Sequence, residues 1–253
     1  MKINIIPCLS DNYAYIINDE KTNTVGVVDP SESLPIINFL KKENLKPNYI
    51  LNTHHHYDHI GGNIELKKMY NVKIVGFIND RHRIPGIDIM LKDNEKWVFG
   101  NSRVNVMHIP GHTLGHICFY FEKEKIIFTG DTLFSLGCGR IFEGTHKQML
   151  KSLEKIKNLP KETKIYCGHE YTYKNAEFCM KYDKDNISLQ KKFKKVKKLR
   201  SQNLPTVPTN IEEELKSNIF LRCNQNDLKI KLNMKNEEDF KVFKKVRDLK
   251  DIF

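Results

Sequence analysis

The residues with the greatest chemical potential lie in one short stretch, Thr53 to Asn63, with the sequence THHHYDHIGGN. Imidazole and carboxylate groups are donors that suit zinc and other divalent first-row metals. A lone histidine is more often a surface or core residue, and a histidine-rich tract can be a repetitive metal scavenger. This stretch is not repetitive, and its order HxHxDH predicts a metal-binding loop. Its candidate ligands are His54, His56, Asp58 and His59.

The neighbouring segments predict where this loop lies. Tyr49 to Leu51 is a short apolar run with β-forming residues, so we expect a buried strand that ends just before the loop. Helical spacing from about Ile60 to Tyr70 predicts a helix after it. We expect Gly61 and Gly62 to let the backbone turn tightly, so that side chains close in sequence converge.

Three further segments place metal-type residues where a strand-like run gives way to glycine. They are Pro110 to His116 (PGHTLGH), Thr129 to Asp131 (TGD) and Cys167 to His169 (CGH). They add His112, Asp131 and His169, which makes seven candidate ligands. Seven is too many for one four-coordinate zinc ion but divides sensibly between two. If Asp131 bridges, each ion has three more protein ligands, and the two ions share a water-derived hydroxide.

The alternation of apolar runs predicts the fold class. Short β-type runs alternate with helical patterns through the first part of the chain, which predicts sheets with helices on their outer faces, an α/β sandwich. Asp29-Pro30-Ser31 predicts a turn and a helix start. The predicted strands are 3–6, 13–17, 25–28, 49–51, 73–77, 97–99, 104–108, 117–121, 126–128 and 164–167. The predicted helices are 34–42, 60–70 and 147–156.

After about Asn175 the strand patterns fade, and Lys-rich helical patterns continue to the C-terminus. We therefore predict two domains. The first, 1–174, is the catalytic α/β domain, and the second, 175–253, is a smaller α-helical domain.

Composition limits the class of protein. With 253 residues, 40% of them hydrophobic, the chain can bury a substantial core. No run approaches the roughly 18 apolar residues of a membrane span. The first residues, MKINIIPC, lack the features of a signal or transit peptide, so we expect a cytoplasmic protein. The six cysteines form no CxxC pair, which favours free thiols over disulfides. The net charge of +11 attracts anions of any kind.

Four motifs follow one another along the first part of the chain: HxHxDH at 54–59, GHT at 111–113, GDT at 130–132 and GHE at 168–170. In this order they resemble the motifs of the metallo-β-lactamase superfamily. The resemblance covers roughly the first 175 residues and implies an αββα sandwich with the site at one edge of the two sheets. It implies that one metal ion is held by His54, His56 and His112, the other by Asp58, His59 and His169, with Asp131 as the bridge.

Further segments resemble one family of that superfamily, the glyoxalase II or hydroxyacylglutathione hydrolase family. They are GCGRIFEGT at 137–145, HEY at 169–171 and RDLKDIF at 247–253, whereas the stretch 181–236 is not closely matched. The resemblance implies that 175–253 is a glutathione-binding domain. The substrate-binding residues that it implies are Arg140, Phe142, Tyr171, Arg247 and Lys250.

Each of these residues has a physical reason to bind glutathione. The ligand carries two carboxylates, which a cationic clamp of Arg140, Arg247 and Lys250 would hold. Tyr171 would hydrogen-bond the peptide backbone of glutathione. The family sometimes has Tyr where Phe142 stands, so Phe142 is limited to packing and to its backbone amide. Without the resemblance, Arg247 and Lys250 would be interpreted as a solvated helix face.

The activity that the resemblance implies is hydrolysis of S-(2-hydroxyacyl)glutathione, such as S-D-lactoylglutathione, to glutathione and a 2-hydroxy acid such as D-lactate. This reaction is the second step of methylglyoxal detoxification in the glyoxalase pathway. Two divalent metal ions, zinc first with iron or manganese as alternatives, would bind a bridging hydroxide that attacks the thioester carbonyl. The expected catalytic residues are Asp58 and Asp131. Thiolate leaves readily, so no protein acid is demanded.

Two other functions stay open. A glutathione persulfide dioxygenase of the same superfamily shares much of the metal signature but would use a single iron; FEGT after GCGR and the closing RDLKD favour the hydrolase. An RNA-processing phosphodiesterase would use the basic run Lys191 to Arg200. Few aromatics interleave that run, and at helical spacing it is more often a solvated surface. We expect a small-molecule substrate, with no nucleic acid, no membrane and no obligate protein partner.

The remaining residues near these motifs receive structural roles. We expect His55 to point away from its neighbours and His116 to support the site from behind the ligands. Cys138 is interpreted as a buried inert thiol and Asp29 as a turn residue.

Overall fold

The computed structural model describes every residue, Met1–Phe253, and the chain forms two compact units. Unit 1 contains Met1–His108 and Gly115–Gly130, and unit 2 contains Ile109–Leu114 and Asp131–Phe253. The change of composition at 174/175 lies inside unit 2. The compact units and the predicted domains therefore divide the chain at different places.

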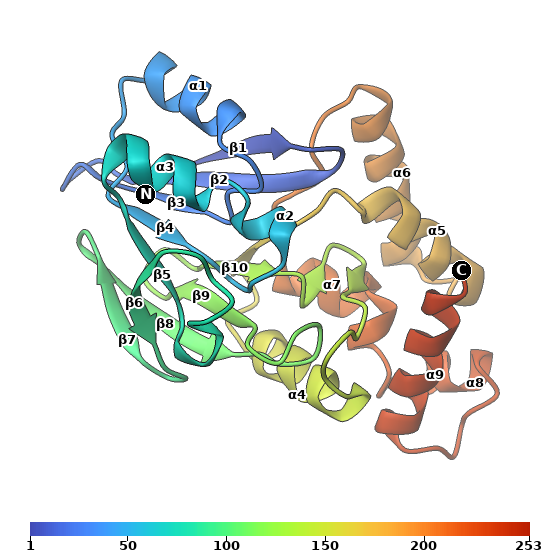
Figure 1. Cartoon of the computed structure of the whole chain (residues 1–253). Helices are drawn as coiled ribbons and strands as arrows, with labels where there is room; N and C mark the ends of the chain where they lie inside the picture. Colours follow the sequence, from blue (N-terminus) through green and yellow to red (C-terminus); the bar gives the residue numbers. More distant parts are fainter. The chain divides into compact units, whose positions relative to one another are not determined.

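The first sheet of unit 1 has six strands in the order β1-β2-β3-β4-β5-β6. Strands β1 to β3 pair antiparallel, and β3 to β6 pair parallel. Helices α1 (Leu34–Lys42) and α3 (Asn63–Tyr70) lie over one face of this sheet (Figure 1), where Ile36, Leu40 and Leu66 join its buried core. The strands are β1 (Lys2–Cys8), β2 (Asn12–Asp19), β3 (Thr24–Val28), β4 (Tyr49–Leu51), β5 (Lys73–Phe77) and β6 (Ile87–Leu91), with a 3-10 turn η1 (Ile78–Asp80) after β5.

The second sheet of unit 1 is antiparallel, in the order β10-β9-β8-β7. It faces the first sheet: the Tyr15 ring lies 5.4 Å from that of Phe128, and the Tyr49 ring lies 5.0 Å from that of Trp97. All five residues of β9 are buried. Aromatic pairs and apolar strands thus close a two-sheet core. The strands are β7 (Lys96–Phe99), β8 (Ser102–His108), β9 (Ile117–Phe121) and β10 (Ile126–Gly130).

Unit 2 is mainly helical. In Figure 1, α5 and α6 run side by side, and α4 packs against the C-terminal helix α9. Two short strands, β11 (Leu133–Phe134) and β12 (Gly137–Cys138), form a hairpin, and β13 (Lys164–Cys167) pairs with β14 (Thr209–Asn210). The helices are α4 (His146–Lys157), α5 (Thr172–Tyr182), α6 (Ile187–Ser201), α7 (Ile211–Ser217), η2 (Ile219–Leu221), α8 (Asn226–Lys231) and α9 (Asp239–Asp251).

The predicted fold class, an αββα sandwich followed by a helical C-terminal part, is confirmed. None of the helices combines the length and the apolar composition needed to span a bilayer. All six cysteines are free and buried. Burial raises the pKa of Cys8 to about 11 and the pKa values of Cys167 and Cys179 to about 12.

The single helix predicted for 60–70 is wrong. Two helices take its place: α2 (Tyr57–Ile60) and α3, which begins at Asn63. The glycines between them have φ values of −58° and −83°, so they do not supply a tight left-handed turn. They instead permit a close approach, because a Cβ atom on Gly61 would lie 2.4 Å from the carbonyl oxygen of Ser31.

Candidate active-site residues

The metal-binding loop of unit 1 follows β4, as predicted, and its first histidine is fixed in orientation. His54 is fully buried, and its ring stacks on that of His116 at 4.6 Å, which agrees with the supporting role expected of His116. The hydroxyl of Thr53 donates to Asp29 (2.6 Å) and lies 3.0 Å from Nδ1 of His54. Because the only hydroxyl proton points to Asp29, Thr53 accepts from His54 Nδ1. The lone pair of His54 is therefore on Nε2, the nitrogen that can bind a metal.

Asp29 orients a second ligand in the same way. Its Oδ2 lies 3.0 Å from Nδ1 of His59, so the carboxylate holds the proton on Nδ1 and leaves the lone pair on Nε2. Its Oδ1 accepts from the backbone nitrogen of Thr53 (2.8 Å). Asp29 is buried and has a φ of 46°. The expectation that Asp29 is only a turn residue is wrong, because one carboxylate sets the tautomers of two candidate ligands.

The other loop residues lie near these two. Candidate donor atoms of His54 and His56 lie within 4.8 Å of each other, as do those of Asp58 and His59. Asn12 on β2 donates from Nδ2 to Oδ2 of Asp58 at 3.0 Å. This contact joins residues 46 apart in sequence, and the sequence pattern gave no sign of it.

His55 turns away from this group, as expected. Its Nδ1 lies 3.1 Å from Oδ2 of Asp80, which also accepts from Arg83. Burial alone would raise the pKa of Asp80, but the hydrogen bonds from His55 and Arg83 outweigh it and hold that pKa below its ordinary value. His55 therefore anchors the loop to Asp80.

Unit 2 contributes three candidate ligands: a carboxylate and two imidazoles that lie close to one of its oxygen atoms. Oδ2 of Asp131 lies 3.5 Å from Nε2 of His112 and 3.2 Å from Nε2 of His169. All three side chains are buried. Nδ1 of His112 lies 2.7 Å from the carbonyl oxygen of Arg140, which can only accept, so the lone pair of His112 is on Nε2. One carboxylate oxygen of Asp131 therefore lies within 3.5 Å of the Nε2 atoms of two imidazoles.

Two aromatic residues frame His169. Tyr171 stacks on its ring at 4.5 Å with an interplanar angle of 7°, and Phe134 lies edge-on at 6.0 Å. Close packing limits the rotation of the imidazole. A Cβ atom on Gly139 would lie 1.9 Å from the carbonyl oxygen of Asp131, so only glycine fits where the chain passes the candidate bridge.

The predicted substrate residues differ in their surroundings. Arg140 is exposed, and its guanidinium donates to Asp251 at 3.2 Å through Nε. Phe142 is 62% exposed, and its ring lies 5.2 Å from that of His112. Both residues are thus accessible beside the unit 2 ligands.

Arg247 and Lys250 on α9 behave differently from a solvated face. Arg247 is only 3% exposed, and its Nη1 donates to the carbonyl oxygen of Cys138 (2.8 Å). Its Nη2 donates to Asp251 at 2.9 Å. The amine of Lys250 lies over the ring of Phe178 at 5.2 Å and forms no ion pair. Burial, and then the nearby charge of Arg247, lowers the pKa of Lys250.

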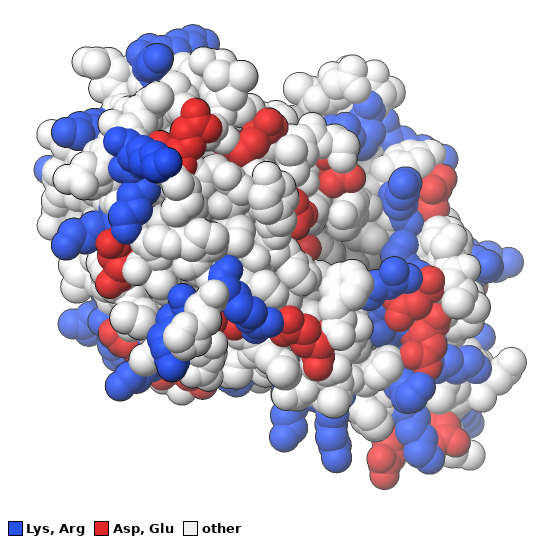
Figure 2. Space-filling view, in the orientation of Figure 1, with Lys and Arg blue, Asp and Glu red and all other residues white.

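Two residues of the basic run in α6 contact other parts of the protein, whereas its remaining lysines are exposed, namely Lys191, Lys194, Lys195, Lys197 and Lys198. Lys192 is 9% exposed, and its amine donates to Thr209 at 2.7 Å. Arg200 donates to the carbonyl oxygen of Leu204 at 2.8 Å. On the face shown in Figure 2, Lys and Arg are interspersed with Asp and Glu.

Comparison with known proteins decides the family. A family model described as the metallo-beta-lactamase superfamily matches residues 10–169, and one described as the hydroxyacylglutathione hydrolase C-terminus matches 170–253. The chain is 53% identical to the hydroxyacylglutathione hydrolase of Pelagibacter ubique (strain HTCC1062) over 253 residues, 100% of both chains. It is 42% identical to that of Methylococcus capsulatus over 100% of this chain and 99% of the relative.

The chain belongs to the hydroxyacylglutathione hydrolase family. The resemblance carried by the four motifs and the C-terminal segments is thereby confirmed. Solved structures agree on the fold of this hydroxyacylglutathione hydrolase family member. The BLEG-1 B3 metallo-beta-lactamase matches with a TM-score of 0.67 and 25% identity over 87% of this chain and 99% of that chain. ETHE1 from Myxococcus xanthus matches with a TM-score of 0.68 and 22% identity over 99% and 98%.

The residues of this hydroxyacylglutathione hydrolase family member fit divalent metal ions. Unit 1 supplies imidazoles whose Nδ1 protons are held by Thr53 and Asp29, and unit 2 supplies His112, whose Nδ1 proton is held by a carbonyl oxygen. Orientation of metal-binding histidines through their second nitrogen is a usual feature of such sites. Nitrogen and oxygen donors without thiolate suit zinc, iron and manganese alike.

Proposed function

We propose that this chain hydrolyses S-(2-hydroxyacyl)glutathione, such as S-D-lactoylglutathione, to glutathione and a 2-hydroxy acid, the second step of the glyoxalase pathway. One observation carries the proposal: the relation to hydroxyacylglutathione hydrolases extends over the whole chain, C-terminal part included, at 53% identity. The C-terminal part, 175–253, is the proposed glutathione-binding domain.

The proposed cofactors are two divalent metal ions, zinc in the first place. His54, His56 and His112 would hold one ion, Asp58, His59 and His169 the other, and Asp131 would bridge them. Such ions, when bound, supply a water of lowered pKa and polarise a carbonyl group. Support comes from the tautomers set by Thr53, Asp29 and the Arg140 carbonyl, and from the position of Asp131 between two imidazoles.

The chain's own side chains then hold the reacting groups. Asp131 lies between His112 and His169 and offsets the positive charge of the site. Asp58 receives a hydrogen bond from Asn12, which fixes the direction of its carboxylate. The reaction forms a carbon–oxygen bond with water and breaks the carbon–sulfur bond. Glutathione leaves as a thiolate, which needs no acid from the protein because a thiol pKa of about 8.5 makes thiolate a far better leaving group than an amine anion.

The proposed binding residues would contact different parts of glutathione. Lys250 has no carboxylate partner, so it is suited to bind a carboxylate of the ligand directly. Arg140 is exposed, and exposed ion pairs are weak, so a ligand carboxylate can replace Asp251 as its partner. Arg247 already donates to the carbonyl oxygen of Cys138 and so holds the end of the β11–β12 hairpin in place. Tyr171 would donate from its hydroxyl to the peptide of glutathione, and Phe142 would pack against the ligand.

The decisive experiment follows loss of thioester absorbance with S-D-lactoylglutathione, before and after chelation, alongside metal analysis. We expect turnover that chelation abolishes and zinc restores, with two ions bound per chain. One bound iron together with oxygen uptake on glutathione persulfide would support the dioxygenase instead. Steeply salt-dependent RNA binding with cleavage would support a phosphodiesterase.

A further inference from the structure

The hairpin β11–β12 begins two residues after Asp131, the proposed bridging ligand. Its strands pair Leu133–Phe134 with Gly137–Cys138, which leaves Ser135 and Leu136 as the tip. Leu136 has a φ of 59°, in the left-handed region that a leucine rarely adopts. A tip in this conformation needs partners that hold it.

Buried side chains from elsewhere in unit 2 supply those partners. Glu214 on α7 accepts from the backbone nitrogen of Leu136 at 2.8 Å. Asn218 donates to the carbonyl oxygens of Phe134 (3.3 Å) and Gly137 (3.1 Å), and also to Glu214 (2.9 Å). Glu214 and Asn218 are both fully buried. The two side chains therefore act as one anchor for the hairpin tip.

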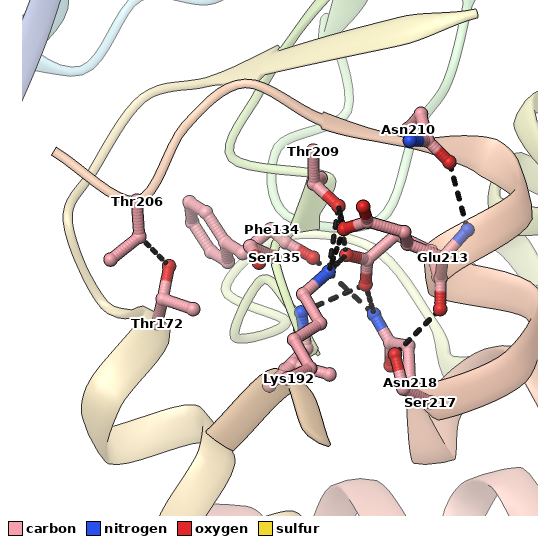
Figure 3. Close-up of polar contacts among 12 residues, drawn as sticks. Phe134, Ser135, Thr172, Lys192, Thr206, Thr209, Asn210, Glu213, Ser217 and Asn218 are labelled. Carbon is pink, nitrogen blue, oxygen red and sulfur yellow. Dashed lines mark hydrogen bonds and ion pairs between the residues drawn. The ribbon is translucent and has the colours of Figure 1, made fainter. Parts of the chain in front are cut away.

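The anchor brings a charge into the interior, and Lys192 compensates it. The amine of Lys192 donates to Glu214 and to Thr209 (2.7 Å), while Thr209 donates to Glu214 (2.6 Å). Figure 3 shows Lys192 reaching toward Thr209, with Asn218 close by. An apolar pair of similar volume would stabilise a core equally well or better. The charged pair adds an oriented acceptor for the amide of Leu136.

The strands of the hairpin contact residues of the proposed site. The Phe134 ring lies 5.3 Å from that of Tyr171 and 6.0 Å from that of His169. The carbonyl oxygen of Cys138 accepts from Arg247. Since each strand has only two residues, a shift of the tip is carried to these contacts.

We propose that Glu214, neutralised by Lys192, is a positioning residue: through the hairpin it fixes Asp131, and through Phe134 the His169 ring, for metal binding. The inference rests on the proposed function and deepens it. Glu214 touches neither metal nor substrate, and its effect passes through the hydrogen bond to Leu136.

Two double variants separate that hydrogen bond from the charge. Lys192→Met with Glu214→Gln removes the ion pair but keeps an acceptor for the Leu136 amide. Lys192→Met with Glu214→Leu removes the ion pair and the acceptor together. The zinc-loaded proteins are compared for kcat, KM and zinc release to a chelator. The metal-free proteins are compared for hydrogen exchange over residues 133–138.

We expect the Gln double variant to stay close to wild type in all measurements. The Leu double variant should release zinc roughly 10- to 100-fold faster and lose kcat by a similar factor, the range for outer partners of metal ligands. Its KM should change by less than about threefold, and exchange over 133–138 should be faster even without metal. Equal zinc release, kcat and exchange in the two double variants would overturn the proposal and leave the pair as a stability feature.

Leu228→Ala in α8 is the matched control, because it removes a fully buried side chain of the same unit. It should lower stability in urea without faster zinc release or faster exchange over 133–138. If it releases zinc as fast as the Leu double variant at equal stability, positioning is excluded. Failure of the proposed function is distinguishable, since a wild type that ignores the thioester still allows the zinc-release and exchange comparison.

Discussion

The two units supply metal-type residues in contrasting ways. In unit 1 the candidate ligands lie within one stretch, His54 to His59, and a side chain, Asp29, orients two of them. In unit 2 the candidate ligands His112, Asp131 and His169 are far apart in sequence, and a backbone carbonyl orients one of them. The unit 1 ligands are thus sensitive to substitution of an outer side chain. The unit 2 ligands depend on loop geometry, which the β11–β12 hairpin provides.

Asp131→Asn should show the largest effect, because Asp131 faces both unit 2 histidines. We expect kcat to fall by more than about 100-fold, beyond the range for outer partners. Asp58→Asn is the matched control in unit 1. The side chain of Asp58 is 37% exposed, and its Oδ2 lies 3.7 Å from Nε2 of His59. Its loss of kcat should be smaller. Equal losses would remove the distinction between a shared and an unshared carboxylate.

Asp29→Asn tests the outer partner of unit 1. An amide cannot accept at both positions as the carboxylate does, so the tautomers of His54 and His59 are no longer fixed. We expect metal affinity to fall roughly 10- to 100-fold, as measured by chelator competition. Arg140→Ala is the counterpart in unit 2. It leaves the backbone carbonyl in place, so metal affinity should not change while KM rises; a matching loss of affinity would contradict this contrast.

Arg247→Ala tests the support of the hairpin exit. Removing the guanidinium leaves the buried carbonyl of Cys138 without its donor, which should cost about 1–3 kcal/mol of unfolding free energy in urea. KM should also rise. Lys250→Ala should raise KM with a smaller loss of stability, because its amine forms no ion pair. Equal stability losses would place Lys250 among the structural residues.

The pH dependence of KM gives the smallest effect. Burial and the charge of Arg247 lower the pKa of Lys250, so its amine loses its charge at a pH below the ordinary value of 10.5. KM should therefore rise as alkaline pH passes through this lowered pKa. Between the lowered pKa and pH 10.5 the unfolded chain binds more protons at Lys250 than the folded chain does. The contribution of Lys250 to the free energy of unfolding therefore increases with pH over this range. Lys250→Met should abolish the rise in KM. If KM of this variant still rises with pH, another group is responsible.

The sequence identified the candidate ligands because their types and glycine-flanked spacing are local properties. Strand β4 and helix α1 were also predicted to their bounds, since apolar spacing alone marks them. Strand β6 was missed because Asp88 interrupts its apolar run, and pairing with β5 holds the strand. Strands β11, β12 and β14 have two residues each and no detectable period.

The supporting residues escaped prediction for a different reason. Asp29 stands in a turn signature that explains it locally, although its partner Thr53 is 24 residues away. Glu214 and Lys192 lie in polar helices, where a charged residue predicts exposure. Only tertiary structure brings Glu214 to Leu136, which is 78 residues distant. Candidate ligands were therefore visible in the sequence, and the groups that orient them were not.

The six buried cysteines have a consequence for an enzyme whose product is a thiol. Thiol–disulfide exchange proceeds through the thiolate, so a thiol of raised pKa reacts slowly. Burial raises the pKa of Cys138 despite the neighbouring guanidinium of Arg247, and the thiols of Cys167 and Cys179 are protonated up to about pH 12. Oxidised glutathione that accumulates around the enzyme therefore finds no accessible sulfur to modify, and turnover is insulated from the redox state of its own product.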